Sequence, residues 1–431
     1  MVKCGQLPNG VRFYSQYESS SSLELPVIVV NAGSLHDPHG KRGLAHLVEH
    51  VITEESKTFD SRRAGALVAR ACGGPDDDIL ITTSWAATTY GPSDMRRRAH
   101  ARELFRMFSS MVRDPVIRHA TTLVEKAAVH QEHYLFGEDV IVDRIRDALY
   151  EATFPKTFLA RNPIDGYMED VRQLKLSDIK SFVNRYYIPS NTFVVYFGPR
   201  HEEVKALVAN EFGTWKKTDG KKWQKFRLPK MLGGFEPLKQ PQEREVTIAG
   251  MHQHHAMIGF PTETYLSEDA EALDVLAFLF SERMYSELRS KNKKWEAGAY
   301  RTPVETERTF GHGIFSFHFA TLDERFLVKG IETFREQCQL LCTELLSPEE
   351  VEIAVGFLYD YLFKDSFTRW TEGLLESVIQ AAANGDTHLE RLHSRGERLQ
   401  KLLKRNGRQK LREVAQKYLS GNSATVIAKP S

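Results

Sequence analysis

Apolar residues occur along this chain in two alternating kinds of pattern. Short β-branched runs, such as residues 26–33 with the sequence PVIVVNAG, have the length and composition of buried strands. Longer segments, such as residues 119–136, repeat apolar side chains at helical spacing. Because strand and helix patterns alternate in both halves of the chain, we predict an α+β fold.

A repeated pattern divides the chain into two similar parts. Residues 187–196 (YIPSNTFVVY) and residues 418–427 (YLSGNSATVI) each follow an amphipathic helix and run into a strand, about half the chain apart. Residues 216–240 are polar and contain Gly and Pro, which is typical of a linker. We therefore predict a first domain over residues 1–215 and a second over residues 241–431.

The motif that carries chemistry is the pentapeptide HLVEH at residues 46–50. On a helix, His46 and His50 project from one face, one turn apart, and can hold a single metal ion. Glu49 lies at the edge of the same face. Neutral nitrogen ligands, an open position for water and a carboxylate base are the requirements of zinc hydrolysis, and the order H-x-x-E-H is the inverted form of the zinc-peptidase motif. The alternative is a pair of surface histidines on an ordinary helix.

The residues before this motif favour metal binding. The strand predicted over residues 26–33 is followed by turn-forming residues and by Gly43, so the motif falls in the first turns of a helix. His36 and His39 lie in the intervening loop, where histidines are more often solvated than bound to metal.

A third ligand is expected from residues 119–136. Glu125 and Glu132 are seven residues apart there, so both carboxylates point the same way from the predicted helix. One glutamate can complete a site of two histidines and one carboxylate while the other orients a ligand. A solvated helix face is the alternative explanation of the same pair.

With these motifs the chain resembles the pitrilysin-type inverzincin family, which includes insulysin and the mitochondrial processing peptidase. The resemblance rests on G-x-x-H-x-x-E-H from Gly43, on the downstream pair of glutamates, on residues 7–11 (LPNGV) and on residues 83–90 (TSWAATTY), and it extends over nearly the whole chain. It implies two similar α/β-sandwich halves that face each other across a peptide-binding chamber. Residues 83–90 resemble the family's strand that pairs with extended peptide substrates. We therefore expect the edge strand around residues 79–84 to bind the substrate backbone here.

The resemblance also implies the roles of the site residues. His46, His50 and Glu132 would bind zinc, and the glutamate of the pentapeptide would be the general base. Glu125 would hydrogen-bond to one of the metal ligands and orient it. The interval from His50 to Glu125 is closer to the family's usual spacing than the interval from His50 to Glu132. Residues 72–78 (CGGPDDD), however, have the composition of a loop in which extra residues are tolerated, so we assign Glu132 as the ligand.

The second half contains no second zinc motif. Residues 271–289 take the place of the zinc helix there without H-x-x-E-H, so only one half is expected to perform chemistry. Arg289 resembles the family's substrate-binding arginine. The partner tyrosine of the family would fall at Glu296, and Tyr300 is the nearest substitute. Residues 251–255 (MHQHH) lead into a strand pattern, which argues against a metal site there.

Composition argues against several other classes of protein. The 431 residues include 58 Lys and Arg and 57 Asp and Glu, and this near-zero net charge argues against nucleic acid as a main partner. No apolar run approaches the roughly 20 residues of a membrane helix. The N-terminal segment enters a strand pattern directly and only four cysteines are present, so we expect a cytoplasmic protein with reduced thiols.

Together these features predict a zinc-dependent endopeptidase that cuts extended peptides or unfolded segments. Chains of this length in the family usually work as homodimers or as heterodimers with a related subunit, and we expect the same here. Two alternatives stay open: a scaffold or partner subunit of the same fold without proteolysis, and a zinc-binding module without turnover.

Overall fold

A computed structural model describes most of the chain. It covers residues 2–19, 24–72, 79–92, 100–134, 138–155, 157, 163–216, 236–248, 250–263, 267–290, 300–301, 305–309, 312–364, 374–384 and 389–430. The described residues exclude residues 73–78 of the Gly/Pro/Asp loop, residues 217–235 of the predicted linker and Glu296.

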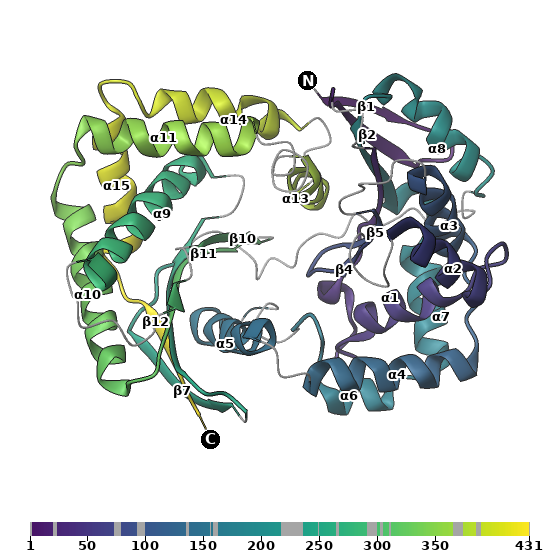
Figure 1. The fold of residues 1–431 in the computed structure, drawn as a ribbon, viewed down its shortest axis with the longest axis horizontal. Helices are drawn as coiled ribbons and strands as arrows, with labels where there is room; N and C mark the ends of the chain where they lie inside the picture. Colours follow the sequence, from purple (N-terminus) through teal and green to yellow (C-terminus); the bar gives the residue numbers. More distant parts are fainter. Residues whose placement is uncertain are drawn as a thin grey trace. The chain divides into compact units, whose positions relative to one another are not determined.

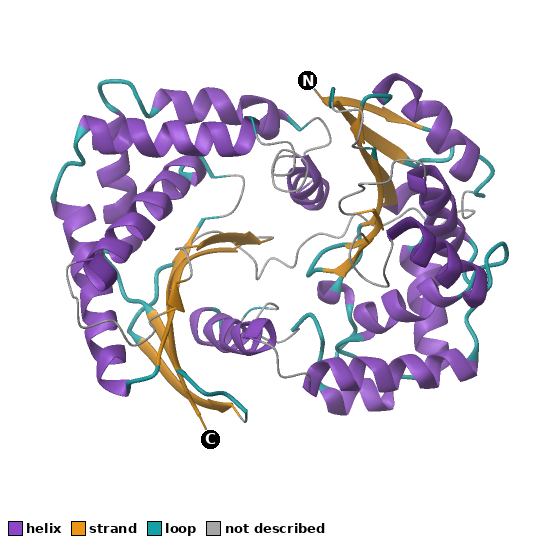
Figure 2. Ribbon diagram, in the orientation of Figure 1, coloured by secondary structure: helices purple, strands orange, loops and turns teal. Residues whose placement is uncertain are grey.

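The chain forms two compact units. One comprises Met1–Tyr134, Asn162–Arg227 and Ser366–His393, and the other comprises Leu135–Arg161, Leu228–Asp365 and Ser394–Ser431. Figure 1 labels their elements, and Figure 2 shows that both units combine helices with a β-sheet, as the sequence predicted. Neither unit is a continuous stretch of sequence, because each includes a segment from the other half of the chain.

The first unit is built on a six-stranded sheet. From edge to edge its strands are β1 (Val2–Gln6), β2 (Arg12–Tyr17), β6 (Thr192–Gly198), β3 (Leu25–Val30), β5 (Thr88–Pro92) and β4 (Ile79–Thr83). The central strands β3 and β6 are buried along their whole length, as their apolar, β-branched sequences predicted. β4 is the edge strand next to β5, so residues 79–83 form the edge strand predicted around residues 79–84.

Helix α1 (Leu44–Glu54) carries the HLVEH motif. It packs against α3 (Ala101–Arg113), α4 (His119–Tyr134) and α7 (Leu176–Tyr186), and α3 in turn covers β3 and β5. The apolar face of α1 is buried and consists of Leu44, Leu47, Val48, Val51 and Ile52. The unit also contains α2 (Ser61–Cys72), α6 (Met168–Gln173), α8 (Val204–Phe212), α13 (Glu376–Asn384) and the short 3-10 helices η1 (Ser34–His36), η4 (Pro189–Asn191) and η5 (His201–Glu203).

The second unit contains another six-stranded sheet. Its strands run in the order β10 (Glu305–Thr309), β11 (His312–Thr321), β8 (His254–Thr262), β12 (Ala424–Pro430) and β7 (Gln242–Ile248), and β9 (Tyr300–Arg301) also pairs with β11. Side chains alternate across β8, so Ile258 and Phe260 enter the main apolar core while Gly259 lies against Leu149 on the opposite face. Its helices are α5 (Glu138–Thr153), α9 (Ala270–Tyr285), α10 (Glu324–Thr343), α11 (Pro348–Phe363), α15 (Gly407–Leu419) and the π-helical η7 (Ser286–Ser290). Helix α14 (Glu390–Lys401) belongs to this unit from residue 394 onward.

The predicted internal repeat is confirmed by strand pairing. β6 follows α7 and pairs in parallel with β2 and antiparallel with β3. β12 follows α15 and pairs in parallel with β7 and antiparallel with β8. Helix α9 follows β8 as α1 follows β3, but α9 has no zinc motif. None of the described helices combines the length and apolar character needed to cross a membrane.

Candidate active site

A glycine and a buried aspartate define the start of α1. Gly43 precedes the helix with φ of 86°, a left-handed conformation that glycine adopts without a steric penalty. The backbone N–H groups of Gly43, Leu44 and Ala45 donate to the carboxylate of Asp37 at 2.8, 3.2 and 2.8 Å. These N–H groups have no partner within the helix, so the Asp37 oxygens satisfy them. Burial raises the pKa of Asp37 to about 8, against the opposing effect of these three hydrogen bonds. Asp37 therefore holds the end of α1 from which His46 projects.

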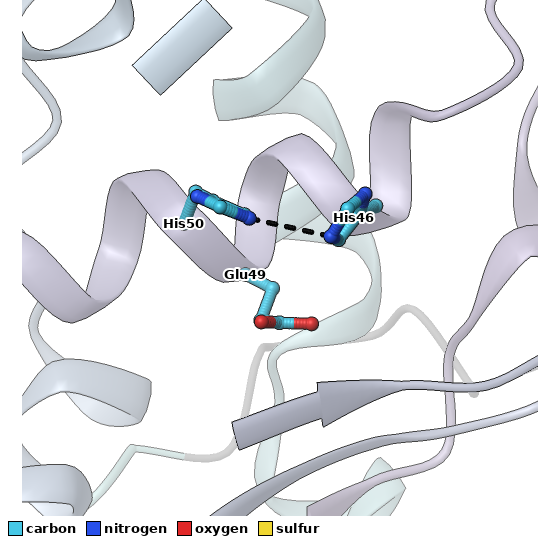
Figure 3. Close-up of side chains that lie close together, drawn as sticks. All are labelled: His46, Glu49 and His50. Atoms are coloured by element: carbon cyan, nitrogen blue, oxygen red, sulfur yellow. Dashed lines mark hydrogen bonds between the residues drawn. The ribbon is translucent and has the colours of Figure 1, made fainter. Parts of the chain in front are cut away.

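The two histidines of the motif lie side by side on α1 (Figure 3). The Nε2 atoms of His46 and His50 are 3.2 Å apart, and the ring centroids are 4.8 Å apart. This arrangement confirms the helical i, i+4 spacing predicted from the sequence. Both rings are mostly buried, which restricts their orientation.

Glu132 of α4 completes a triangle of donor atoms with the histidines. Its Oε2 atom lies 3.3 Å from Nε2 of His50 and 3.6 Å from Nε2 of His46. Ligands bound about 2.0–2.1 Å from a tetrahedral zinc ion are about 3.3–3.4 Å from one another. Two imidazoles and one carboxylate at these separations therefore fit zinc in both chemistry and spacing. The Glu132 side chain is 46 % exposed, so this corner of the triangle is open to solvent.

Glu125, two turns earlier on α4, occupies a different position. Its Oε2 atom is 3.3 Å from Nδ1 of His50, the ring nitrogen that faces away from the triangle, and its side chain is only 12 % exposed. Burial lowers the pKa of His50, but the carboxylates of Glu125 and Glu132 outweigh burial and raise it to about 10. The hydrogen bond to His50 in turn lowers the pKa of Glu132.

The carboxylate of Glu49 projects from α1 below the histidine pair (Figure 3). A ligand atom of Glu49 lies within 4.8 Å of ligand atoms of both His46 and His50. Its Oε2 atom accepts a hydrogen bond of 2.6 Å from the hydroxyl of Thr83, the last residue of β4. Thr83 was not singled out in the sequence, although it opens the TSWAATTY segment that carried part of the family resemblance.

A second residue without a sequence signal lies beside His46. The Nδ1 atom of His46 is buried, and no described residue makes a hydrogen bond to it. The Oδ1 atom of Asp165 lies 3.6 Å away. Asp165 is 119 positions later in the chain and lies in a turn. The sequence does not indicate that this turn packs against α1.

The other histidines considered as metal ligands lie outside the candidate site. His36 is buried, its Nδ1 atom accepts the N–H of Gly33 at 3.1 Å, and burial lowers its pKa to about 4. His39 is exposed. His255 lies in β8 and hydrogen-bonds to His318 of β11 at 2.9 Å, so the histidine-rich segment does continue into a strand as predicted.

Two substrate-binding predictions fall in the second unit. Arg289 belongs to η7, and Tyr300 belongs to β9, where it pairs with Ala320 of β11. The side chains of Arg289 and Tyr300 lie outside the described part of the structure. Their roles remain predictions.

Comparison with known proteins defines the class. Residues 13–165 match the family described as Insulinase (Peptidase family M16), and residues 173–357 match the Peptidase M16 inactive domain. The chain belongs to the M16 peptidases, the pitrilysin-type family that its motifs resemble.

Individual relatives are distant in sequence and close in fold. The chain is 25 % identical to the zinc protease PqqE of Helicobacter pylori over 289 residues, which are 66 % of this chain and 62 % of that relative. It is 21 % identical to an uncharacterized zinc protease of Rickettsia bellii over 359 residues, 81 % of this chain and 80 % of the relative. The crystal structure of a protease from Helicobacter pylori superposes with a TM-score of 0.81 at 20 % identity, covering 100 % of this chain and 99 % of that one. The first half of the periplasmic protease PqqL from Escherichia coli gives 0.75 at 14 % identity, covering 99 % and 91 %.

Proposed function

We propose that this protein is a zinc-dependent endopeptidase that cuts extended peptides or unfolded segments. The observation that carries the proposal is the triangle formed by Nε2 of His46, Nε2 of His50 and Oε2 of Glu132, with the Glu49 carboxylate beside it. Two relatives named as zinc proteases support the same class of activity.

Each residue of the site has a distinct task in this proposal. His46, His50 and Glu132 hold the metal, and bound zinc supplies a Lewis acid that acidifies water and polarises a carbonyl. A neutral imidazole that binds metal through Nε2 carries its proton on Nδ1. The Nδ1–H of His50 would therefore donate a hydrogen bond to the carboxylate of Glu125. Glu49 takes the proton of the attacking water and delivers it to the leaving amine.

The edge strand β4 is proposed to bind the substrate. An extended peptide can pair with the backbone of an edge strand, which gives affinity without strong sequence preference. β4 ends at Thr83, whose side chain touches Glu49. A peptide that pairs along β4 would therefore pass close to the base.

Oligomeric state and location rest on sequence alone. We propose a homodimer or a heterodimer with a related subunit, acting in the cytoplasm. Size-exclusion chromatography with light scattering tests the first point, and cell fractionation tests the second.

One experiment separates the proposed activity from its alternatives. The purified protein is incubated with a quenched fluorescent peptide library, with and without a chelator, and its zinc content is measured in parallel. Cleavage that stops with chelator and returns with zinc supports the endopeptidase. Stoichiometric zinc without cleavage would indicate a binding module, and absence of both would indicate a scaffold, a role suited to the M16 domain described as inactive.

A further inference from the structure

We propose that Thr83 is a positioning residue that holds Glu49 as a base and keeps it from becoming a metal ligand. The inference rests on the proposed function, because it concerns the base of that reaction. It goes beyond that proposal by assigning a role to the strand that faces the zinc helix.

The contact between Thr83 and Glu49 is short and buried. The hydroxyl of Thr83 donates to Oε2 of Glu49 at 2.6 Å, within the range of the stronger, charge-assisted hydrogen bonds. Thr83 is 5 % exposed and Glu49 is 7 % exposed. The two residues come from different elements, α1 and β4, which pack directly against each other. The hydrogen bond therefore determines where one carboxylate oxygen points.

Glu49 needs such a restraint because of what lies beside it. A carboxylate is itself a common zinc ligand, and ligand atoms of Glu49 and both histidines lie within 4.8 Å of one another. A small rotation of an unrestrained glutamate would bring a carboxylate oxygen into the position that water must occupy. The Thr83 hydroxyl withholds one oxygen from that position, and it does so from the strand proposed to pair with substrate.

Three variants test the role of the hydroxyl. Thr83→Val removes the donor at nearly constant shape, and Thr83→Ser retains it. Thr153→Val, which removes the buried threonine hydroxyl of α5 that donates to the carbonyl of Leu149, is the matched control. We expect Thr83→Val to lower kcat by about 10–100-fold, the usual effect of losing a partner that orients a site residue. We expect its zinc affinity to be equal to or higher than wild type. Thr83→Ser should recover most of the activity, and Thr153→Val should match wild type.

A binding measurement separates positioning from substrate binding. In a Glu49→Gln background, adding Thr83→Val should leave the dissociation constant of a peptide unchanged, because the base is already absent. Wild-type kcat in Thr83→Val, no recovery in Thr83→Ser, or weaker peptide binding in the double variant would overturn the proposal. If Glu49→Gln alone kept full activity, the assignment of the base would fail instead.

A separate observation concerns the other ring nitrogen of His46. We infer that Asp165 orients His46 as Glu125 orients His50. Nδ1 of His46 must carry the proton when Nε2 binds zinc, and the buried Nδ1 has Oδ1 of Asp165 at 3.6 Å. A displacement of about 0.7 Å brings this pair to the usual hydrogen-bond length of about 2.9 Å.

The segment that carries Asp165 is anchored on the start of α1. Gly166 donates its N–H to the carbonyl of Pro163 at 3.0 Å, which closes a tight turn around Asp165. Gly166 has φ of 73°, and a Cβ there would lie 2.3 Å from the backbone nitrogen of Gly43, so the turn and the helix start meet backbone to backbone.

Arg42 provides the second anchor. Its Nε and backbone N–H donate to Asp170 at 2.5 and 3.2 Å, and its guanidinium lies 4.0 Å from the ring centre of Tyr167. The residues that follow Asp165 are therefore tied to the segment that leads directly into the helix carrying His46.

Metal affinity tests this role without reference to turnover. In competition with a chromogenic chelator, we expect Asp165→Ala to bind zinc about 10-fold more weakly than wild type. Asp165→Asn, which keeps an oxygen acceptor, should lie between them. Glu169→Ala, an exposed carboxylate four residues away, is the control and should match wild type, as should the unfolding midpoint of all metal-free variants. Wild-type affinity in Asp165→Ala would overturn the inference, whereas absence of zinc binding by the wild type would overturn the proposed function.

Discussion

The carboxylates of Glu125 and Glu132, two turns apart on α4, contact opposite nitrogens of the same imidazole. Oε2 of Glu125 is 3.3 Å from Nδ1 of His50, and Oε2 of Glu132 is 3.3 Å from Nε2. Only Glu132 is also near Nε2 of His46, at 3.6 Å. The geometry therefore favours Glu132 as the metal ligand and Glu125 as the residue that hydrogen-bonds to the His50 ring.

This relationship predicts different outcomes for two matched substitutions. Glu132→Ala should lose most of its zinc, because a ligand is removed, whereas Glu125→Ala should retain zinc with affinity reduced by about 10–100-fold. Metal analysis after dialysis against a weak chelator distinguishes them. The opposite ranking would make Glu125 the ligand.

Glu49→Gln is expected to bind zinc and to lose peptidase activity. The substitution preserves size and removes only the basic carboxylate, and removal of a general base typically lowers the rate by about 10²–10⁴-fold. Peptide hydrolysis and zinc content are measured on the same preparation. Cleavage at the wild-type rate would show that another group accepts the proton.

Arg289→Ala is expected to raise KM for a peptide while zinc content stays unchanged. The prediction follows from the family resemblance, in which this arginine binds substrate. Arg335→Ala, on α10 of the same unit and half exposed, is the control for removing one positive charge. Equal KM values for both variants and the wild type would exclude a substrate-binding role for Arg289.

Acid should destabilise the protein through a buried histidine pair in the second unit. Burial and the neighbouring His254 lower the pKa of His255 to about 4, and burial, His255 and Arg146 lower the pKa of His318 to about 3. In the unfolded chain both imidazoles take up protons below about pH 6.5, whereas in the folded chain they stay neutral. The stability that they contribute is therefore present above pH 6.5 and is lost as the pH falls toward 4.

Denaturant unfolding at pH 7, 6 and 5 measures this effect. The free energy of unfolding should fall by up to about 1.4 kcal/mol per pH unit for each histidine. His318→Gln, which cannot titrate, should show a smaller decrease than wild type over the same range. An equal decrease in both proteins would assign the acid sensitivity to other groups.

Local sequence determined the elements that carry the candidate site. The spacing of His46 and His50, the glycine before α1 and the seven-residue interval between Glu125 and Glu132 follow from helix periodicity alone. Strand β3 and the repeated helix–strand segment could also be predicted from local sequence, because runs of apolar residues and turn-forming residues indicate where buried strands begin and end. These features depend on residues within one helix or strand, or on the residues directly beside it in the sequence.

Tertiary structure decided which side chains meet. Thr83 reaches Glu49 from β4, and Asp165 approaches His46 from a turn, although the partners are 34 and 119 positions apart in the sequence. Helix α5 follows α4 in sequence, yet it packs on β7, β8 and β12 of the second unit. No periodic pattern records such contacts, because they depend on how separately formed elements pack and on which backbones can approach closely, as Gly43 and Gly166 do.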